Sequence, residues 1–255
     1  MAAMFRADDL SVQFGGIRAV DSVSFEVEVG EVFSIIGPNG AGKTTIFNLI
    51  SRIYQPTSGK LMLDGRDITS VPAYQVAGLG IARTFQNIEL FQNASVLQNL
   101  LIGCHCHVKA GILSQICFLP SAKRDELVHR ERAEDVIAFL GLQRYRHTLI
   151  GSLPYGVRKV VELGRALCTE PKLLLLDEPS SGLNVEETEG MGYWIEDIKQ
   201  DLGITVIMVE HDMSLVSAVS DRVLALNYGR VMALGTPREV QTHPDVVRAY
   251  IGGEA

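Results

Sequence analysis

The sequence has no apolar run long enough to cross a membrane. A spanning helix needs about 18 or more consecutive apolar residues, whereas the longest runs here are short and typical of buried strands: Val32–Ile36, Leu173–Leu176 and Ile204–Val209. The N-terminus, MAAMFRADDL, has no charged segment followed by an apolar one, so it does not resemble a secretory signal. We therefore expect a protein that stays in the cytoplasm and reaches a membrane only through a protein partner.

Positive charge is also scarce. The chain carries 23 Lys and Arg against 30 Asp and Glu, which gives a formal net charge of −7. Nucleic acids and anionic lipids are usually bound by basic surfaces, so this balance argues against both as general partners. The 255 residues, 47% of them hydrophobic, suffice for a large core in one compact α/β unit or in two closely joined lobes.

Cysteine is limited to four positions: Cys104, Cys106, Cys117 and Cys168. Two of them fall in the run Cys104-His105-Cys106-His107, which is the one pattern that invites a metal-site interpretation. Zinc ligands, however, usually come in two separated pairs at wider spacing. Reduced thiols are therefore the expected state of these cysteines.

The first half of the chain shows strand patterns and then a helix. Polar and apolar residues alternate over the first thirty positions, which predicts antiparallel strands; the apolar positions are Leu10, Val12 and Phe14, then Val23, Phe25, Val27 and Val29. The apolar run at 32–36 predicts a buried strand that ends at a glycine-rich turn. A helix is expected next, with one apolar face formed by Ile46, Phe47, Leu49, Ile50 and Ile53.

The pattern changes to helical from about residue 89 to 168. Ala133, Val136, Ile137 and Leu140 recur at helical spacing, and Gly141 suits a helix C-terminus. Strand-like runs then return at 173–176, 205–209 and 222–226, separated by helical stretches. Strands that alternate with helices predict a mostly parallel sheet with helices on its faces. The middle segment is then a helical lobe inserted into an α/β core.

One segment matches the phosphate-binding pattern G-x-x-x-x-G-K-[ST]. It consists of Gly37, Pro38, Asn39, Gly40, Ala41, Gly42, Lys43 and Thr44. Glycines let the backbone N–H groups surround phosphates, and the following helix presents its positive end. Lys43 would neutralise the terminal phosphates, and the Thr44 hydroxyl would contact Mg²⁺. A chance match in a chain of this length is expected about 1 time in 100, and a strand before and a helix after favour nucleotide binding over an ordinary turn.

Two adjacent carboxylates follow the apolar run at 173–176. Asp177 and Glu178 lie at the end of a predicted strand, where neighbouring side chains point in different directions and can take different roles. Asp177 suits the Mg²⁺ shell, and Glu178 suits the general base that polarises the attacking water. An isolated Asp-Glu pair would more often be a solvated turn, but the phosphate loop favours the catalytic interpretation.

With these motifs the chain resembles the ATPases of ABC transporters from end to end. The resemblance implies that Phe14, in VQFGG, stacks on adenine; that Gln86, in ARTFQN, links Mg²⁺ and the attacking water to the membrane partner; and that His211, in IMVEHD, contacts the γ-phosphate. Alone, Phe14 would be a core residue, His211 a surface histidine, and Gln86 would carry no signal. GIARTFQNIELF and HPDVVRAYIG resemble in particular the branch that serves branched-chain amino acid uptake.

The family signature, usually L-S-G-G-Q, is altered in this chain. Its counterpart is Leu153–Val157, in which Pro154 replaces Ser, Tyr155 replaces Gly and Val157 replaces Gln, while Gly156 is kept. Pro154 is tolerable in a first helical turn, and Gly156 still allows close approach to phosphate. The segment Ser180–Asn184 lies where the family has its D-loop. The resemblance implies that the signature contacts the ATP of a second, facing subunit.

The resemblance also implies a fold and a set of ligands. We expect an α/β P-loop NTPase of the ABC type, with a mostly parallel core sheet, an antiparallel β subdomain and an inserted helical subdomain. The expected divisions are 1–88, 89–168, 169–238 and a tail at 239–255. ATP and Mg²⁺ are the expected ligands. Expected nucleotide contacts are Phe14, residues 37–44, Thr45, Leu153, Tyr155 and Gly156; expected Mg²⁺ contacts are Thr44, Gln86 and Asp177; expected catalytic residues are Glu178, His211 and Gln86.

Partners follow from the same resemblance. We expect transmembrane permease subunits, a second ATPase subunit that is identical or a sister chain, an extracytoplasmic solute-binding protein acting indirectly, and a position on the cytoplasmic face of the inner membrane. ATPases of urea or amide importers, aromatic-acid importers and lipopolysaccharide exporters have similar sequences and remain alternatives. A nucleic-acid-linked ABC ATPase is disfavoured, because the chain has no long coiled-coil insertion or zinc module. A translation-type protein would carry two cassettes, and a small P-loop kinase would lack the signature.

One apolar segment of the helical lobe has two interpretations. Gly111–Pro120, GILSQICFLP, precedes a run of basic and acidic residues. An exposed apolar patch usually marks an interface, so the segment is a candidate seat for the membrane subunit. A small local core would explain it equally well.

Overall fold

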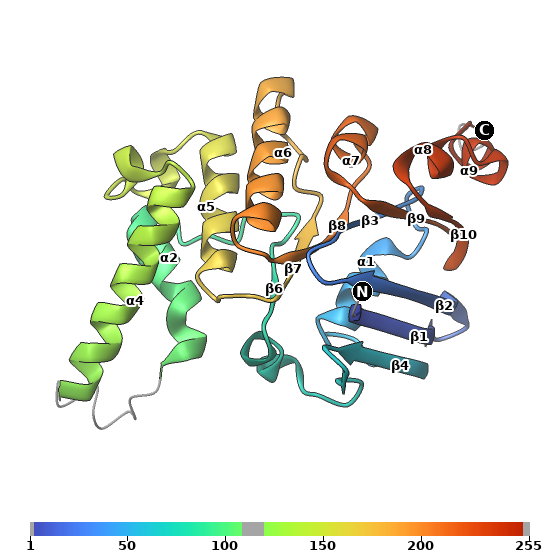
Figure 1. Cartoon of the computed structure of the whole chain (residues 1–255), viewed down its shortest axis with the longest axis horizontal. Helices are drawn as coiled ribbons and strands as arrows, with labels where there is room; N and C mark the ends of the chain where they lie inside the picture. The colour runs from blue at the N-terminus through green and yellow to red at the C-terminus, as the bar shows by residue number, and fades with distance from the viewer. Residues whose placement is uncertain (1–2, 109–119, 252–255) are drawn as a thin grey trace.

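The computed structural model describes residues 3–108 and 120–251. The docking hypothesis for Gly111–Pro120 therefore concerns residues outside the described part, apart from Pro120, which begins a helix. The described strands form two sheets: a four-stranded sheet in the order β2-β1-β4-β5 and a six-stranded sheet in the order β10-β9-β3-β8-β7-β6. Figure 1 shows the two sheets to the right of a group of helices, with the N-terminus on the smaller sheet.

The four-stranded sheet is antiparallel, as the alternating pattern predicts. It consists of β1 (Ala3–Phe14), β2 (Ile17–Glu28), β4 (Ser58–Leu63) and β5 (Arg66–Asp67). In the register of β1 and β2, Ala7 faces Phe25 and Leu10 faces Val23. Two apolar positions of the pattern are exposed, Phe14 by 45% and Val29 by 49%, because β1 ends at one and β2 ends just before the other.

The six-stranded sheet is parallel except for its edge strand β10. Its members are β3 (Val32–Ile36), β6 (Ile81–Arg83), β7 (Leu173–Asp177), β8 (Thr205–Val209), β9 (Arg222–Asn227) and β10 (Arg230–Gly235), of which β10 runs antiparallel to β9. Every residue of β3, β7 and β8 is buried. Helices cover both faces of such sheets, which explains why these strands are continuous apolar runs without alternation.

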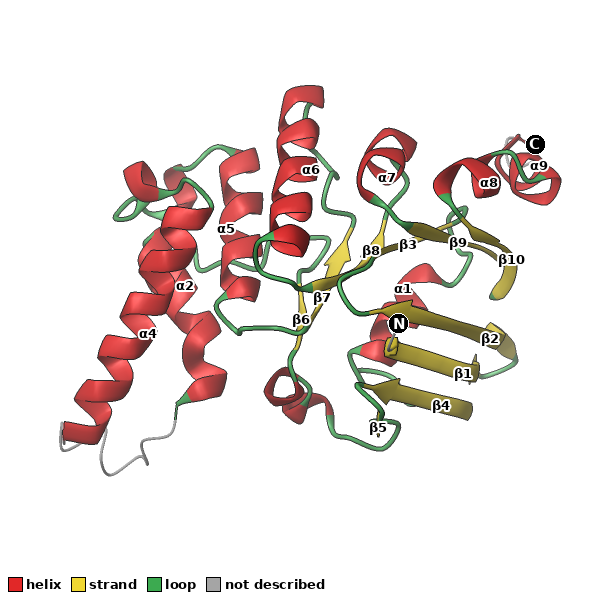
Figure 2. Ribbon diagram, viewed as in Figure 1, coloured by secondary structure: helices red, strands yellow, loops and turns green. Residues whose placement is uncertain are grey.

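Helices complete the fold in two groups. Their bounds are α1 (Lys43–Ile50), α2 (Val96–Gly103), α4 (Pro120–Phe139), α5 (Tyr155–Leu167), α6 (Val185–Gln200), α7 (Met213–Val219), α8 (Pro237–Gln241) and α9 (Pro244–Ile251), with short 3₁₀ turns at 73–75, 77–79, 104–107, 143–145 and 150–152. Figure 2 shows α2, α4 and α5 together at one end of the molecule and α1 between the two sheets. Helices α6 to α9 lie on the face of the larger sheet that points away from α1. This is the predicted α/β arrangement with an inserted helical lobe.

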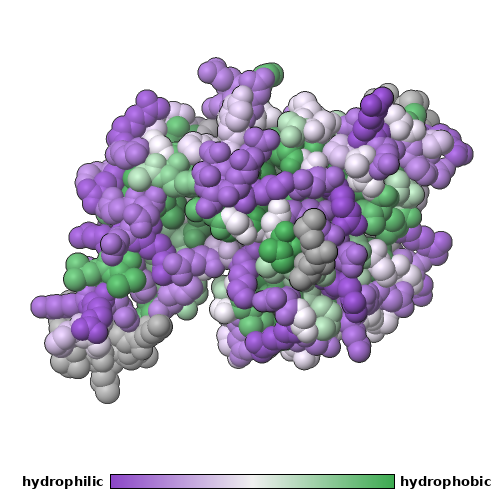
Figure 3. All heavy atoms as spheres, viewed as in Figure 1, coloured by the Kyte–Doolittle hydropathy of each residue, from purple (hydrophilic) through white to green (hydrophobic). Residues whose placement is uncertain are grey.

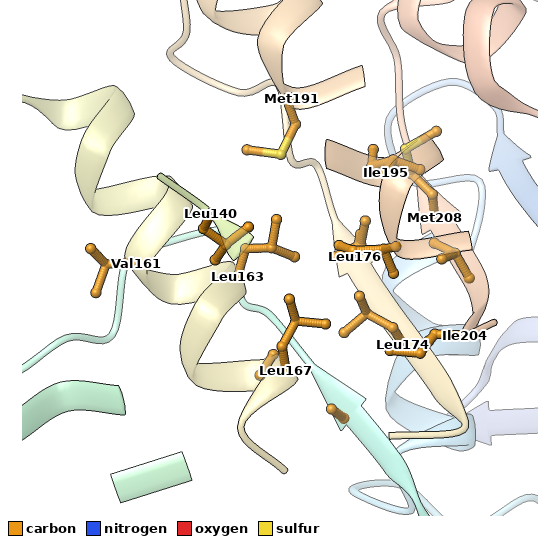
Figure 4. Packing of buried hydrophobic residues seen from close by; sticks show 14 of the residues in the cluster. Leu140, Val161, Leu163, Leu167, Leu174, Leu176, Met191, Ile195, Ile204 and Met208 are labelled. Carbon is orange, nitrogen blue, oxygen red and sulfur yellow. The ribbon is translucent and has the colours of Figure 1, made fainter. Parts of the chain in front are cut away.

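Two apolar cores lie on opposite faces of the larger sheet. Leu173 and Leu175 of β7 point into one core with α1 and the smaller sheet, whereas Leu174 and Leu176 point into the other with α5 and α6. Figure 4 shows the second core, in which side chains of β7 meet Leu163 and Met191. Each fully buried leucine contributes about 1.5–3 kcal/mol relative to an exposed one. Hydrophilic side chains cover most of the face seen in Figure 3.

The C-terminal ends of α1 and α4 can be compared with two predictions from the sequence. Ile46, Phe47, Leu49 and Ile50 of α1 are buried, but Ile53 is 51% exposed, so its assignment to the apolar face is wrong. The helix ends at Ile50 and Arg52 adopts a left-handed backbone with φ of 60°, which turns the chain away from the core. The assignment of Gly141 is confirmed, because it has φ of 66° and follows the last turn of α4.

None of the described helices could cross a membrane. Among the helices within residues 3–108 and 120–251, none combines the length and the apolar character that a membrane span requires.

Candidate active site

The phosphate loop connects β3 to α1 at a point where the backbone is crowded. Gly37 has φ of 152° and Gly42 has φ of 103°, which side chains rarely allow. A Cβ atom at Gly37 would lie 2.3 Å from the carbonyl oxygen of Leu226, and one at Gly42 would lie 2.7 Å from that of Ala19. Both glycines are therefore required by close backbone packing as well as by conformation.

Lys43 begins α1 and is buried. Its Nζ donates to the carbonyl oxygens of Gly37 at 2.6 Å and Pro38 at 3.0 Å, and only 7% of the residue is exposed. Burial lowers the pKa of Lys43, while the nearby carboxylates of Glu178 and Asp177 raise it in part. Thr44 and Thr45 follow in the first turn of α1, where no side chain caps the helix. Those free N–H groups and the helix dipole favour an anion, so the cradle fits a phosphate group.

Asp177 forms a buried ion pair that the sequence did not reveal. It is the last residue of β7, and its Oδ2 accepts from Nη2 of Arg83, at the end of β6, at 2.7 Å. Only 6% of the Asp177 side chain and 9% of that of Arg83 are exposed. Nη1 of Arg83 also donates to Asn48 and Ser51 at the end of α1. The predicted Mg²⁺ ligand is thus held in place by a cation from the neighbouring strand.

This pair gives a testable expectation for stability. Arg83→Met should lower the free energy of unfolding by about 3–5 kcal/mol, because it leaves the carboxylate of Asp177 buried without its partner. Urea unfolding of Arg83→Met, Asp177→Asn and the double variant measures the coupling, and the double variant should lose less than the sum of the single losses. Arg66→Met, a change of the same kind at an exposed residue of β5, is the control. A loss below about 1 kcal/mol for Arg83→Met would contradict the assignment.

The three predicted catalytic side chains meet beside the end of β7. Nε2 of Gln86 donates to Oε2 of Glu178 at 2.9 Å, and Nδ1 of His211 lies 3.9 Å from the same oxygen. Glu178 has a left-handed backbone with φ of 48°, fixed by a hydrogen bond from its N–H to the carbonyl of Val209 at 2.9 Å. Such strained conformations are often found at functional sites. The fold thus brings residues 86, 178 and 211 together, although they are far apart in sequence.

Lys159 is a buried cation that connects these segments to α5. Its Nζ donates to the backbone carbonyls of Gln86 at 3.2 Å and Glu178 at 3.4 Å, and the residue is 4% exposed. Burial lowers the pKa of Lys159, and the carboxylates of Glu162 and Glu210 are the main opposing influences. The sequence analysis assigned Lys159 no role. The available signal was its helical spacing, four residues before the buried Leu163.

Glu210 is a second buried charge without a predicted role. It is fully buried, and its carboxylate accepts from the backbone N–H groups of Ser180 at 2.8 Å, His211 at 2.8 Å and Asp212 at 3.1 Å. A carboxylate with three such donors is well compensated for its burial. Glu210 therefore holds Ser180, the first residue of the segment Ser180–Asn184, beside the segment that carries His211.

Phe14 and the altered signature lie apart from this cluster of side chains. The Phe14 ring is exposed and meets Tyr54 edge-on, with ring centroids 4.9 Å apart, so it is not a core residue. Leu153 is buried, and the Tyr155 hydroxyl donates to the carbonyl of Ser181 at 3.3 Å. A Cβ atom at Gly156 would lie 2.3 Å from Oε1 of Glu187, the end of a side chain that could move aside. Figure 1 shows α5, which carries the signature, well away from α1, so one chain does not bring the two together.

The cysteines of the described residues are free. Cys104 and Cys168 are buried, and Cys106 is exposed. Within residues 3–108 and 120–251, no three His, Cys, Asp or Glu side chains gather in a way that would hold a metal ion by themselves. A magnesium ion at residues 44 and 177 would accordingly take part of its ligands from the nucleotide, as Mg²⁺ commonly does.

Comparison with known proteins relates this geometry to a family. The sequence model of the ABC transporter family matches residues 20–181, and that of the branched-chain amino acid ATP-binding cassette transporters matches residues 230–255. The chain is 39% identical over 243 residues, 95% of both chains, to BraF of Pseudomonas aeruginosa, a high-affinity branched-chain amino acid transport ATP-binding protein. It is 37% identical over 249 residues, 98% of both chains, to LivG of Escherichia coli, which has the same description.

Solved structures show the same relationship. An ATP-binding cassette of an ABC transporter in its ADP conformation superposes with a TM-score of 0.87 at 32% identity, covering 99% of this chain and all of the other. A nucleotide-free cassette superposes with a TM-score of 0.86 at 31% identity, covering 98% of this chain and all of the other.

Proposed function

The chain belongs to the ATP-binding subunits of ABC transporters, and we propose that it hydrolyses ATP to power an importer of branched-chain amino acids. The observation that carries the proposal is the meeting of Gln86, Glu178 and His211 beside the buried Asp177. The similarity to BraF and LivG, together with the match of the branched-chain family model to the C-terminal residues, supports the class of solute.

ATP is bound by the phosphate loop in this proposal. The backbone N–H groups of residues 37–45 surround the phosphates, and Lys43 exchanges its two carbonyl partners for phosphate oxygens. Phe14 and its neighbour Tyr54 offer exposed aromatic surface for the adenine. Thr44, Asp177 and Gln86 are the residues that would hold Mg²⁺, and the ion would supply charge neutralisation for the phosphoryl group.

Hydrolysis is assigned to the cluster around Glu178. The Glu178 carboxylate accepts a proton from the attacking water. Gln86 donates to that carboxylate and orients it, and His211 on the other side contacts the γ-phosphate. Lys159 and Glu210 are positioning residues, because they hold the backbone of these segments and touch no reacting atom.

A second ATPase subunit completes the site. Leu153, Tyr155 and Gly156 of one subunit reach the nucleotide held by the other, which explains their distance from α1 in a single chain. Permease subunits in the inner membrane hold the pair at its cytoplasmic face, and an extracytoplasmic solute-binding protein delivers the amino acid. We assign no nucleic-acid partner. We divide the single cassette at 1–88, 89–168 and 169–238, with a tail at 239–255, in agreement with the clustering of helices α2, α4 and α5.

Uptake measured in cells tests the proposed solute. Deletion of the gene should abolish high-affinity uptake of leucine, isoleucine and valine, and a plasmid copy should restore it, whereas a Lys43→Met copy should not. Urea, aromatic acids and the lipopolysaccharide content of the outer membrane are measured in the same strains. Unchanged uptake of branched-chain amino acids, with loss of another of these activities, would transfer the proposal to that transporter.

The altered signature gives an expectation for dimer formation. A hydrogen bond to a charged phosphate contributes about 1.5–3 kcal/mol, and the hydroxyl and amide of the usual signature are both absent. The candidates for making up the lost contacts are Tyr155, Arg158 and Lys159. Lys159 donates to two backbone carbonyls and Tyr155 donates to that of Ser181, so both are engaged elsewhere. We therefore expect the isolated subunit to stay largely monomeric with ATP, and the permease to hold two copies together in the complex.

Sedimentation of the Glu178→Gln variant with and without ATP measures this directly, because hydrolysis can no longer dissolve a dimer. The further change Val157→Gln should shift this variant from monomer to dimer. A tight ATP-dependent dimer at micromolar Glu178→Gln protein would contradict the weakened signature and would indicate that Tyr155 or Arg158 replaces the lost contacts.

A further inference from the structure

A cavity of about 330 Å³ lies where the helical lobe, α5 and α6 meet. Figure 1 shows α5 between α4 and α6, so the cavity is at the junction between the lobe and the rest of the chain. Gly156 and Val157 of the signature line it, together with Leu183 of the segment Ser180–Asn184. Cavities of about 300–1,000 Å³ are typical of small-molecule sites, and nothing in the mechanism proposed above occupies this one.

The wall of the cavity is largely apolar. Leu140 and Met191 are buried, and Figure 4 shows both among the packed side chains of the core. Val157, Leu183 and Trp194 are only partly buried and pack against the same core. Val157 stands where the usual signature has Gln, so it adds apolar surface where an amide would be polar. A ligand that covers this wall therefore has an apolar body.

Two side chains of opposite charge also line the cavity, Arg144 and Glu187. The guanidinium of Arg144 lies over the Tyr145 ring, 4.6 Å from its centroid, and a stacked guanidinium presents its N–H groups at its edge, where a carboxylate can accept them. Oε2 of Glu187 accepts from the backbone N–H of Asn184 at 3.0 Å, whereas Oε1 lies beside Gly156. The cavity thus offers one cation and one anion next to apolar surface.

We propose that this cavity binds a free aliphatic α-amino acid, and the inference rests on the proposed function for the class of solute. At neutral pH such a molecule carries one carboxylate and one ammonium group. The carboxylate pairs with Arg144, the ammonium pairs with Oε1 of Glu187, and the aliphatic side chain packs on Val157 and Leu183. An amino acid with a charged side chain is disfavoured, because the apolar wall offers that charge no partner.

An occupied cavity connects two segments of the proposed active site. The ligand contacts Val157, which directly follows Gly156, and Leu183 on the other side, so it holds α5 against α6. In the proposed function Gly156 reaches the nucleotide of a second subunit, and a ligand that favours one position of α5 shifts the population toward that position. The imported amino acid, once it accumulates on the cytoplasmic side, therefore lowers the rate of hydrolysis.

Trp194 makes binding measurable in the isolated chain, because it lines the cavity and is the single tryptophan of the sequence. Titration with leucine should change the fluorescence of Trp194 in a saturable way, with a Kd below about 1 mM. Aspartate and lysine should not saturate it. Isocaproate and isoamylamine, which lack the ammonium and the carboxylate of leucine respectively, should bind about 10-fold more weakly or worse. The absence of a saturable change with leucine up to about 10 mM would overturn the inference.

Glu187→Gln tests the ammonium contact and keeps the helix cap, because its amide oxygen can still accept from Asn184. It should raise the Kd for leucine by about 10- to 100-fold and remove the difference between leucine and isocaproate. Arg144→Gln should remove the difference between leucine and isoamylamine. Glu189→Gln, at an exposed residue of α6 outside this cavity, is the control and should bind leucine as the wild type does. Equal affinity of the wild type for leucine and isocaproate would contradict the assignment to an amino acid.

The effect on hydrolysis is measured with the subunit assembled with its permease, without a solute-binding protein. Leucine at about 10-fold above its Kd, which fills most sites, should lower the wild-type rate by about half or more and leave the Glu187→Gln rate unchanged. This comparison separates the cavity from any leucine site in the permease. A wild-type rate that stays constant, or one that falls equally in Glu187→Gln, would overturn the regulatory role. The uptake experiment tests the solute separately, so the cavity can fail while the proposed function holds.

Discussion

Glu178→Gln should lower the kcat of ATP hydrolysis by about 100- to 10,000-fold and leave the affinity for ATP close to that of the wild type. The amide has the shape of the carboxylate, and its oxygen can still accept from Nε2 of Gln86, so the local geometry should be preserved. What it loses is the ability to take a proton from water. The change also keeps a side chain of equal size at a strained position, where φ is 48°.

Steady-state hydrolysis by the subunit assembled with its permease and nucleotide titration of the purified chain measure the two quantities separately. Glu189→Gln makes the same change at an exposed residue of α6 and should retain full activity. A kcat within about 10-fold of the wild type, well short of the usual contribution of a general base, would remove Glu178 from that role. His211 or a phosphate oxygen of ATP itself would then be the acceptor to test.

Lys43→Met should weaken the binding of ATP by about 100- to 20,000-fold, the equivalent of two charged hydrogen bonds at about 1.5–3 kcal/mol each. In the structure Nζ of Lys43 already makes two hydrogen bonds, to the carbonyls of Gly37 and Pro38, at the place where phosphate oxygens would compete for it. Methionine fills nearly the same volume but offers neither charge nor donor.

The fold should tolerate this change. Burial lowers the pKa of Lys43, so keeping the ammonium charged at this position costs folding free energy. The melting temperature of Lys43→Met should therefore equal or exceed that of the wild type in the absence of nucleotide. Lys60→Met, at an exposed position of β4, is the control for both measurements. Nucleotide affinity within about 10-fold of the wild type would show that the backbone N–H groups alone hold the phosphates.

Local chemistry explains which features the sequence predicted. The phosphate loop is eight consecutive residues, and its function depends on their backbone, so its pattern is visible in one segment. The same holds for Asp177 and Glu178, which directly follow a buried strand. Gln86 and His211 have no local signature of their own, and only the order of the motifs along the chain assigned them a role. The structure places both beside Glu178.

Prediction from local sequence patterns failed where the backbone departs from regular geometry or where a strand is short. Ile53 continues the apolar spacing of α1, but the left-handed Arg52 ends that face. The strands β4, β5, β6 and β10 were not predicted, because they are short or partly exposed and lack a clear apolar pattern. Pairing with neighbouring strands stabilises them: β4 pairs with β1, β5 with β4, β6 with β7 and β10 with β9.

The sequence by itself determined the fold class, the phosphate loop, the two carboxylates after β7 and the family, because each depends on periodicity or on residues that are neighbours in the chain. Only the tertiary structure revealed the buried charges that hold the site together. Arg83 and Asp177 are 94 positions apart, and Lys159 and Gln86 are 73 apart. A charged residue in a sequence is expected at the surface. It can hold two segments together in the interior only when folding removes it from water and a partner from a distant segment compensates for the lost hydration.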